Sequence, residues 1–107
     1  MDIFEVTVDL FKCLSRGFFI RFMKDAFSFP SYFGENLDAI DECMEDLSWI
    51  QEKKIRVKLI NYNKALKTNE SAASKLITMF RKYELFWENE GLSKDRKEFM
   101  LVIVPSR

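Results

Sequence analysis

The residues whose chemistry stands out are carboxylates gathered between Phe29 and Ile50. They are Glu35, Asp38, Asp41, Glu42, Glu45 and Asp46, and the same stretch contains no lysine or arginine. The whole chain has 17 basic and 17 acidic residues, so its formal net charge is zero. Residues 26–53 hold seven of the acids and a single base, Lys53, which leaves ten acids against sixteen bases elsewhere. This separation of charge makes the acidic stretch a candidate docking surface for a basic partner.

The spacing of apolar residues predicts that much of this stretch is a helix from Leu37 to Leu47. At the helical angle of about 100° per residue, the apolar residues share one side and Asp38, Asp41, Glu42, Glu45 and Asp46 share the other. Each i,i+4 pair of like charge on that side costs about 0.2–0.5 kcal/mol, and acids near the C-terminus oppose the helix dipole. A face that costs stability in this way favours a role in binding. A solvated acidic face with no partner is the structural alternative.

Aromatic residues flank the predicted acidic helix. Tyr32 and Phe33 precede it and Trp49 follows it. Aromatic side chains beside charge are typical of interface hot spots, whereas packing in the core is the alternative and is favoured for Phe33. Direct binding of nucleic acid by this surface is disfavoured, because its carboxylates repel phosphates.

The same carboxylates allow a metal-binding alternative. Asp38, Asp41, Glu42 and Glu45 lie at i, i+3, i+4 and i+7, where oxygen ligands can share a divalent cation. Any acidic helix offers that spacing, however. The chain has no histidine, the commonest general base, and no glycine-rich phosphate loop. We therefore expect no catalytic residues, no metal site and no cofactor.

Length and composition predict one globular domain over residues 1–107. The chain is 48% hydrophobic and has eleven Phe, which is enough for a hydrophobic core that needs no disulfide bond or structural metal. Neither a signal peptide nor a membrane-spanning run is apparent, so we expect a cytoplasmic protein that does not bind membranes. Cys13 and Cys43 are predicted to be reduced, partly buried thiols.

Hydrophobic periodicity predicts the elements that position the acidic stretch. Alternation predicts strands at 3–8 and 54–60, and a continuous apolar run predicts a buried strand at 99–104. Helical spacing predicts helices at 15–27 and 70–87, with a short helix or turn at 61–67 and a loop at 89–97. Helical connections between strands favour parallel pairing with the helices on one face. The expected fold class is α/β, a small two-layer domain.

The segment Pro30-Ser31-Tyr32-Phe33-Gly34-Glu35-Asn36-Leu37-Asp38-Ala39-Ile40 resembles the P-x-Y-[YF]-G-x-N-L-D-A-[LI] segment of the barstar family. Members of this family are small intracellular inhibitors of barnase-type ribonucleases. Weaker similarity in element order extends across the chain and includes Met79-Phe80-Arg81. The resemblance implies a three-stranded parallel sheet with about four helices, mainly on one face. It also implies that the acidic helix and the loop before it block a ribonuclease active site, where their carboxylates occupy the positions of the substrate phosphates.

Carried over by position, the resemblance implies contacts with the partner at both the loop and the helix. Tyr32, Gly34 and Asn36 match loop contacts, Asp38 matches an acidic contact in the first turn, and Glu42 falls where the family has its dominant inhibitory Asp. The predicted partner-binding surface is completed by Phe33, Asp41, Glu45 and Asp46.

Three departures from the family pattern affect the expected partner. Glu42 is one methylene longer than Asp. Asp41 stands where the best-known member has Trp, and Lys82 stands where that member has a second acidic contact. We therefore expect an immunity-type inhibitor of a related but different basic ribonuclease toxin, monomeric when free. The alternative is a barstar-like binding module for a basic partner that is not a nuclease.

Overall fold

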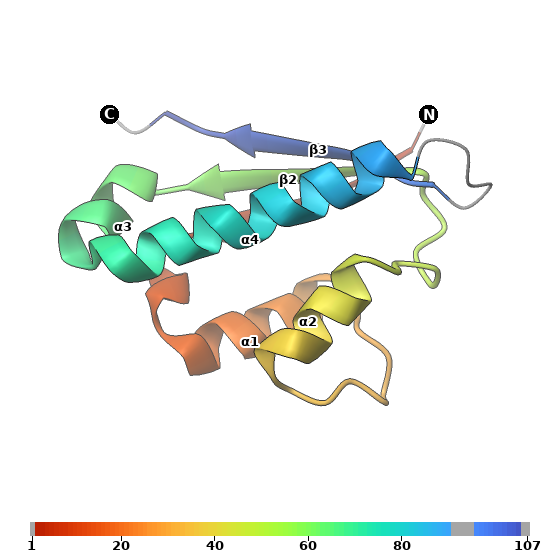
Figure 1. Ribbon diagram of the computed structural model, residues 1–107, viewed down its shortest axis with the longest axis horizontal. Coiled ribbons are helices and arrows are strands. Elements are labelled where there is room, and N and C mark those ends of the chain that lie inside the picture. The colour runs from red at the N-terminus through yellow and green to blue at the C-terminus, as the bar shows by residue number, and fades with distance from the viewer. Residues whose placement is uncertain (1, 91–95, 106–107) are drawn as a thin grey trace.

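The sheet that supports the acidic stretch has three parallel strands. A computed structural model of the chain describes residues 2–90 and 96–105 (Figure 1). Val6 pairs with Val57, and Val57 pairs with Leu101, so the central strand contacts both others in parallel. The strand order is β1-β2-β3, with bounds β1 Ile3–Asp9, β2 Lys54–Ile60 and β3 Glu98–Ile103. The predicted three-stranded parallel sheet is confirmed.

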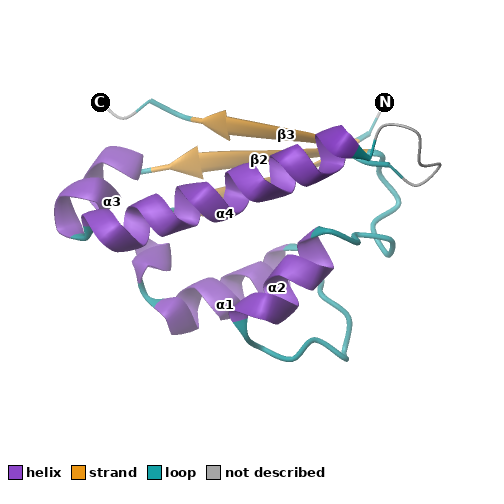
Figure 2. Cartoon of the chain, in the orientation of Figure 1, coloured by secondary structure: helices purple, strands orange, loops and turns teal. Residues whose placement is uncertain are grey.

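Helices connect these strands. In Figure 1, α4 runs along the strands while α1 and α2 lie together on its other side. Figure 2 shows the long loop that joins α1 to α2. Within the described residues the helices are η1 Lys12–Leu14, α1 Arg16–Ala26, α2 Leu37–Met44, α3 Tyr62–Thr68 and α4 Glu70–Asn89. The predicted small α/β architecture is confirmed.

The core lies between one face of the sheet and the helices. Val8, Val57 and Leu59 on that face are buried, whereas Arg56 and Lys58, which alternate with them, are partly exposed. This pattern follows from the period of two along a strand, which sends successive side chains to opposite faces. The largest side chains that the helices bury against this face are Phe19, Phe27, Phe80 and Tyr83. The helices therefore cover the sheet mainly on one face, as predicted.

The N-termini of α1 and α4 are each closed by the side chain of the residue that precedes the helix. Ser15 Oγ accepts a hydrogen bond from the Phe18 amide, and Asn69 Oδ1 accepts one from the Ala72 amide. Each cap satisfies an amide that lacks a partner within its helix. Of the loop predicted at 89–97, residues 91–95 lie outside the described part of the chain.

The acidic helix ends earlier than its apolar spacing predicts. α2 stops at Met44 and Glu45 caps it, so the predicted end at Leu47 is wrong. Leu47 has a φ of 51°, a left-handed conformation that a bulky residue rarely adopts. Its side chain is fully buried, which gives the reason: the chain leaves the helix so that Leu47 can reach the core. Asp46 therefore lies beyond the helix, although the apolar spacing placed it on the helical face.

Both cysteines are free thiols, and both are buried more fully than predicted. Burial, and then the nearby Asp9 carboxylate, raises the pKa of Cys13 to about 12. Burial also raises the pKa of Cys43, with a further contribution from Asp46 and Glu42. A thiol that keeps its proton is a poor nucleophile, so neither cysteine is suited to catalysis.

We expect Cys13 to lower the stability of the fold in alkaline solution. The thiol of the unfolded chain ionises near its ordinary pKa of about 8.5, while the folded thiol stays protonated. Between these two pKa values the free energy of unfolding falls as pH rises, by up to about 1.4 kcal/mol per pH unit. Urea unfolding across this range should show a shallower pH dependence for Cys13→Ala, even though the variant is less stable than the wild type at neutral pH. Identical slopes would contradict the assignment.

Candidate partner-binding surface

The two aromatic residues of the loop before α2 have different environments. Phe33 is buried, and its ring lies 4.9 Å from that of Phe29, centroid to centroid. Tyr32 is 73% exposed. The structure thus places Phe33 in the core, as its alternative interpretation held, and leaves Tyr32 as the aromatic side chain presented to solvent.

Asn36 and Gly34 fix the entry of the loop into α2. The Asn36 side chain accepts a hydrogen bond from the Ala39 amide at 2.8 Å and donates one to the Gly34 carbonyl at 3.3 Å. A Cβ at Gly34 would lie 3.2 Å from the Asn36 side-chain nitrogen, so a larger residue would crowd this cap. Glu35 has a φ of 54° and pairs with Lys24 across 3.6 Å. These contacts join the loop to α1 and to the start of α2 within the free chain.

The outward face of α2 carries carboxylates that form no ion pair with the described cations. Asp38 and Glu42 are exposed and lie one turn apart on the helix. Asp46 is exposed just beyond it, and Glu45 is half-buried. Within residues 2–90 and 96–105, none of these four forms an ion pair. We call Tyr32, Asp38, Glu42 and Asp46 the acidic surface.

Asp41 lies on a different side of α2 from the acidic surface. Its carboxylate accepts a bond from Lys82 Nζ at 2.7 Å and another from the Tyr83 hydroxyl at 2.5 Å, both on α4. Burial, and then the hydrogen bond to Asp41, raises the pKa of Tyr83, so that hydroxyl remains a donor. Asp41 therefore joins α2 to α4, although the helical pattern grouped it with the outward-facing acids.

A small hollow lies between the loop and α2. It has a volume of about 170 Å³, and its lining includes Tyr32, Glu42 and Asp46, with Phe33 and Cys43 among the buried residues. Desolvation, and then the carboxylates of Asp46 and Glu42, raises the pKa of Tyr32. The hollow thus combines two unpaired carboxylates with an aromatic ring. This is the combination that attracts a guanidinium or ammonium group.

Residues from distant parts of the chain anchor the acidic segment. Trp87 Nε1 donates to the carbonyl of Met44 at 2.9 Å, which closes the C-terminus of α2. Lys97 Nζ donates to the carbonyl of Ile50 and, at 2.9 Å, to that of Glu52. No local pattern marked Trp87 or Lys97 for this role, because each lies more than forty residues from its acceptor.

Trp49 is also held within the fold. Its Nε1 donates to the carbonyl of Phe27 at 2.8 Å, and its ring lies edge-on to that of Phe29 at 6.1 Å. The core-packing interpretation of Trp49 therefore describes its position better than a role as an anchor beside the acidic helix.

Two kinds of feature are absent from the described residues, a group of metal-ligating side chains and a membrane-spanning helix. Among residues 2–90 and 96–105, no three His, Cys, Asp or Glu side chains are grouped as a metal site would require. The four carboxylates considered for such a site diverge, since Asp41 turns to α4. In the same part of the chain, no helix has both the length and the apolar character needed to cross a bilayer.

The chain belongs to the barstar family. Residues 3–103 match the family described as barstar, the barnase inhibitor, which covers every strand and helix above. No curated protein sequence matches the chain. Membership implies a protein-binding role of the barnase-inhibitor kind, and the acidic surface is where the structure offers the chemistry for it.

Proposed function

We propose that the chain is an immunity-type inhibitor that binds a basic ribonuclease toxin in the cytoplasm and covers its active site. One observation carries the proposal: Asp38, Glu42 and Asp46 are exposed and unpaired on α2 and the turn after it, within the described part of the chain. The family match and the loop that presents Tyr32 support it. Phe33, Gly34 and Asn36 contribute by holding that loop, and Glu45 adds charge beside it.

The acidic surface suits a ribonuclease active site because such a site is built to bind phosphates. Arg and Lys side chains that hold an RNA backbone also form charge-assisted hydrogen bonds with carboxylates. The hollow between Tyr32, Glu42 and Asp46 is of a size to receive the end of one such side chain. Opposite charge also speeds the encounter of the two proteins, and this effect weakens as salt is added.

The anchored geometry limits the entropy lost on binding. The Asn36 cap, the Trp87 bond to Met44 and the Lys97 bonds all form within the free chain. A preorganised surface loses less conformational freedom when a partner docks, so more of the interaction energy appears as affinity.

The proposed partner differs from barnase itself. Glu42 reaches further from α2 than an Asp would, and Lys82 places a cation beside Asp41, within 2.7 Å. We propose a related basic ribonuclease whose cleft accommodates both features. The chain would act by binding alone, as a monomer, without cofactor, nucleic acid or catalysis.

The direct test is to co-express the chain with the protein encoded beside its gene, which the proposal expects to be the ribonuclease, and to measure degradation of cellular RNA. We expect degradation to stop when the chain is in excess. A ribonuclease that stays fully active beside an excess of folded chain would refute the proposal. Capture of a basic protein that is not a nuclease, through the acidic surface, would support the binding-module alternative in its place.

A further inference from the structure

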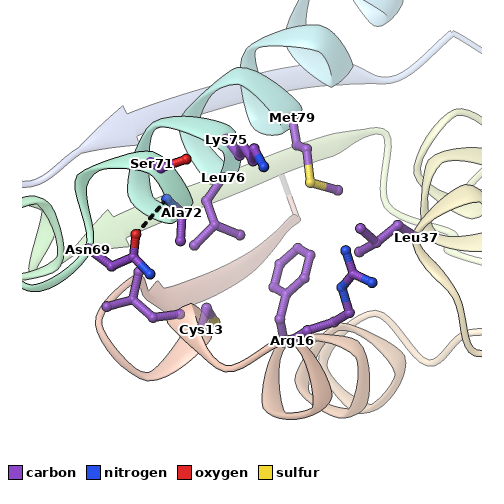
Figure 3. A pocket seen from close by; sticks show the side chains of 11 residues that line it. Cys13, Arg16, Leu37, Asn69, Ser71, Ala72, Lys75, Leu76 and Met79 are labelled. Carbon is purple, nitrogen blue, oxygen red and sulfur yellow. Dashed lines mark hydrogen bonds between the residues drawn. The ribbon is translucent and has the colours of Figure 1, made fainter.

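A second depression lies next to the acidic surface, between the first half of α4 and the start of α1 (Figure 3). It has a volume of about 300 Å³. Leu14, Phe19, Leu37, Leu76 and Met79 give it an apolar lining, and we call it the α1–α4 groove. Figure 3 shows the Met79 and Leu37 side chains on one side of it and Leu76 above Cys13. Covering the apolar side chains of an open groove with another apolar group removes them from water, which lowers the free energy.

The charged residues that line this groove are cations. Arg16 and Lys75 are exposed, and neither has an ion-pair partner among the residues that the structure describes. The polar residues of the lining, Asn69 and Ser71, are neutral, and Asn69 Oδ1 is occupied by the Ala72 amide at 3.1 Å. No carboxylate lines the groove among the residues that the structure describes, although Glu35 and Asp38 line the hollow next to it. The groove therefore has an apolar floor and a positive rim, which is opposite in sign to the acidic surface.

The groove is continuous with the acidic surface. Leu37 lines the groove and is the first residue of α2, and Asp38 follows it. Asp38 lines an adjoining hollow of about 290 Å³ that shares Arg16 and Leu37 with the groove. A protein that covers Asp38 is thus brought to the edge of the groove.

A row of residues on α4 extends from the groove toward α2. Lys75, Met79 and Lys82 are spaced at i, i+4 and i+7, so they form one stripe on α4. Lys82 contacts Asp41 of α2 and is half-exposed. Lys75 and Met79 of the groove lining therefore lie in one row with Lys82, whose charge is paired with Asp41.

We propose that the α1–α4 groove is a second contact region for the same ribonuclease, and that it takes an apolar side chain of that protein with a carboxylate next to it. This inference rests on the proposed function. The apolar side chain would cover Leu76 and Met79, and the carboxylate would meet Arg16 and Lys75. Arg is suited to this role because its guanidinium binds a carboxylate through two parallel hydrogen bonds. A ribonuclease with a cation at this place would be repelled, so the groove selects among basic nucleases.

The test is whether removal of positive charge from the groove weakens or strengthens binding of the ribonuclease. The variant Arg16→Gln/Lys75→Gln removes two positive charges. If the acidic surface alone bound a basic ribonuclease, the variant would bind as tightly as the wild type or more tightly, because repulsion falls. If the groove receives a carboxylate, we expect binding to weaken by about tenfold or more. The matched control is Lys58→Gln/Lys67→Gln, which removes the same charge from residues of β2 and α3 that do not line the groove.

Affinity is measured by titration calorimetry against the ribonuclease encoded beside the gene, in a catalytically inactive form. Weaker binding of the groove variant, with the control unchanged or tighter, supports the proposal. Unchanged or tighter binding of the groove variant overturns it, and the inhibitor function survives if Glu42→Gln still weakens binding. If the wild type does not bind at all, the proposed function fails and this inference falls with it. Met79→Gln gives a second readout, since a loss of affinity that depends little on salt marks the apolar contact.

Discussion

Glu42→Ala is expected to weaken binding of the ribonuclease by at least about 2 kcal/mol, or about thirtyfold, while leaving the stability of the chain almost unchanged. Glu42 is exposed and lines the same hollow as Tyr32. It has no ion-pair partner among the described residues. Its removal breaks no internal contact and relieves like-charge repulsion with Asp38 one turn away. The change should therefore appear in affinity, which calorimetry with the inactive ribonuclease would measure.

Two comparisons sharpen this expectation. Glu42→Gln keeps the size of the side chain and removes its charge, so it should lose most of the same affinity. Added salt should reduce the difference between wild type and variant, because the lost contact is ionic. Parallel losses of affinity and melting temperature in Glu42→Ala would mean that Glu42 supports the fold, and they would contradict its place in the docking surface.

Asp41→Ala is expected to give the opposite result. The variant removes the acceptor of the buried Tyr83 hydroxyl, at 2.5 Å, and of Lys82, at 2.7 Å. Removing one partner of a buried hydrogen bond to a charged group costs about 2–3 kcal/mol. For a domain of this size, that lowers the melting temperature by about 10 °C or more. Affinity of the folded variant for the ribonuclease should change less than it does in Glu42→Ala.

The two variants control for each other, since each removes one carboxylate from the same helix. Urea unfolding of both, with Tyr83→Phe added, isolates the contribution of the internal bond. Tyr83→Phe leaves Asp41 with Lys82 alone and should be destabilised by a smaller amount than Asp41→Ala. An Asp41 variant that is as stable as Glu42→Ala would show that the contact between α2 and α4 contributes little in solution.

Local patterns were enough to place the three strands and the α-helices, but the expected burial of the last strand was wrong, since in β3 only Phe99 is buried and Val102 is 41% exposed. The alternation in β2 and the stripe in α4 each report which side of an element meets the core, and that information is contained in a few neighbouring residues. The caps formed by Ser15 and Asn69 are equally local, because each acts on an amide three residues away.

The sequence could not show which way each acid of α2 points. A helical wheel separates apolar from polar sides, but it places Asp41 with Glu42 because it contains no information about α4. The partners of Asp41 are 41 and 42 residues away, and they become apparent only when the two helices are packed. The end of α2 was missed for a related reason, since Leu47 leaves the helix to fill a space in the core. The family resemblance identified the segment, while tertiary contacts decide which of its residues face solvent.

The most direct test of the account is the kind of inhibition that the chain causes. RNA cleavage by the ribonuclease encoded beside the gene should be measured at several substrate concentrations with increasing amounts of the chain. If α2 and its preceding loop occupy the active site, inhibition will be competitive, so the concentration of chain needed for half inhibition will rise with substrate. Complete inhibition at a ratio of one to one is expected at low substrate. Inhibition that does not change with substrate concentration, or cleavage that continues beside an excess of chain, would contradict the claim that the acidic surface covers the catalytic cleft.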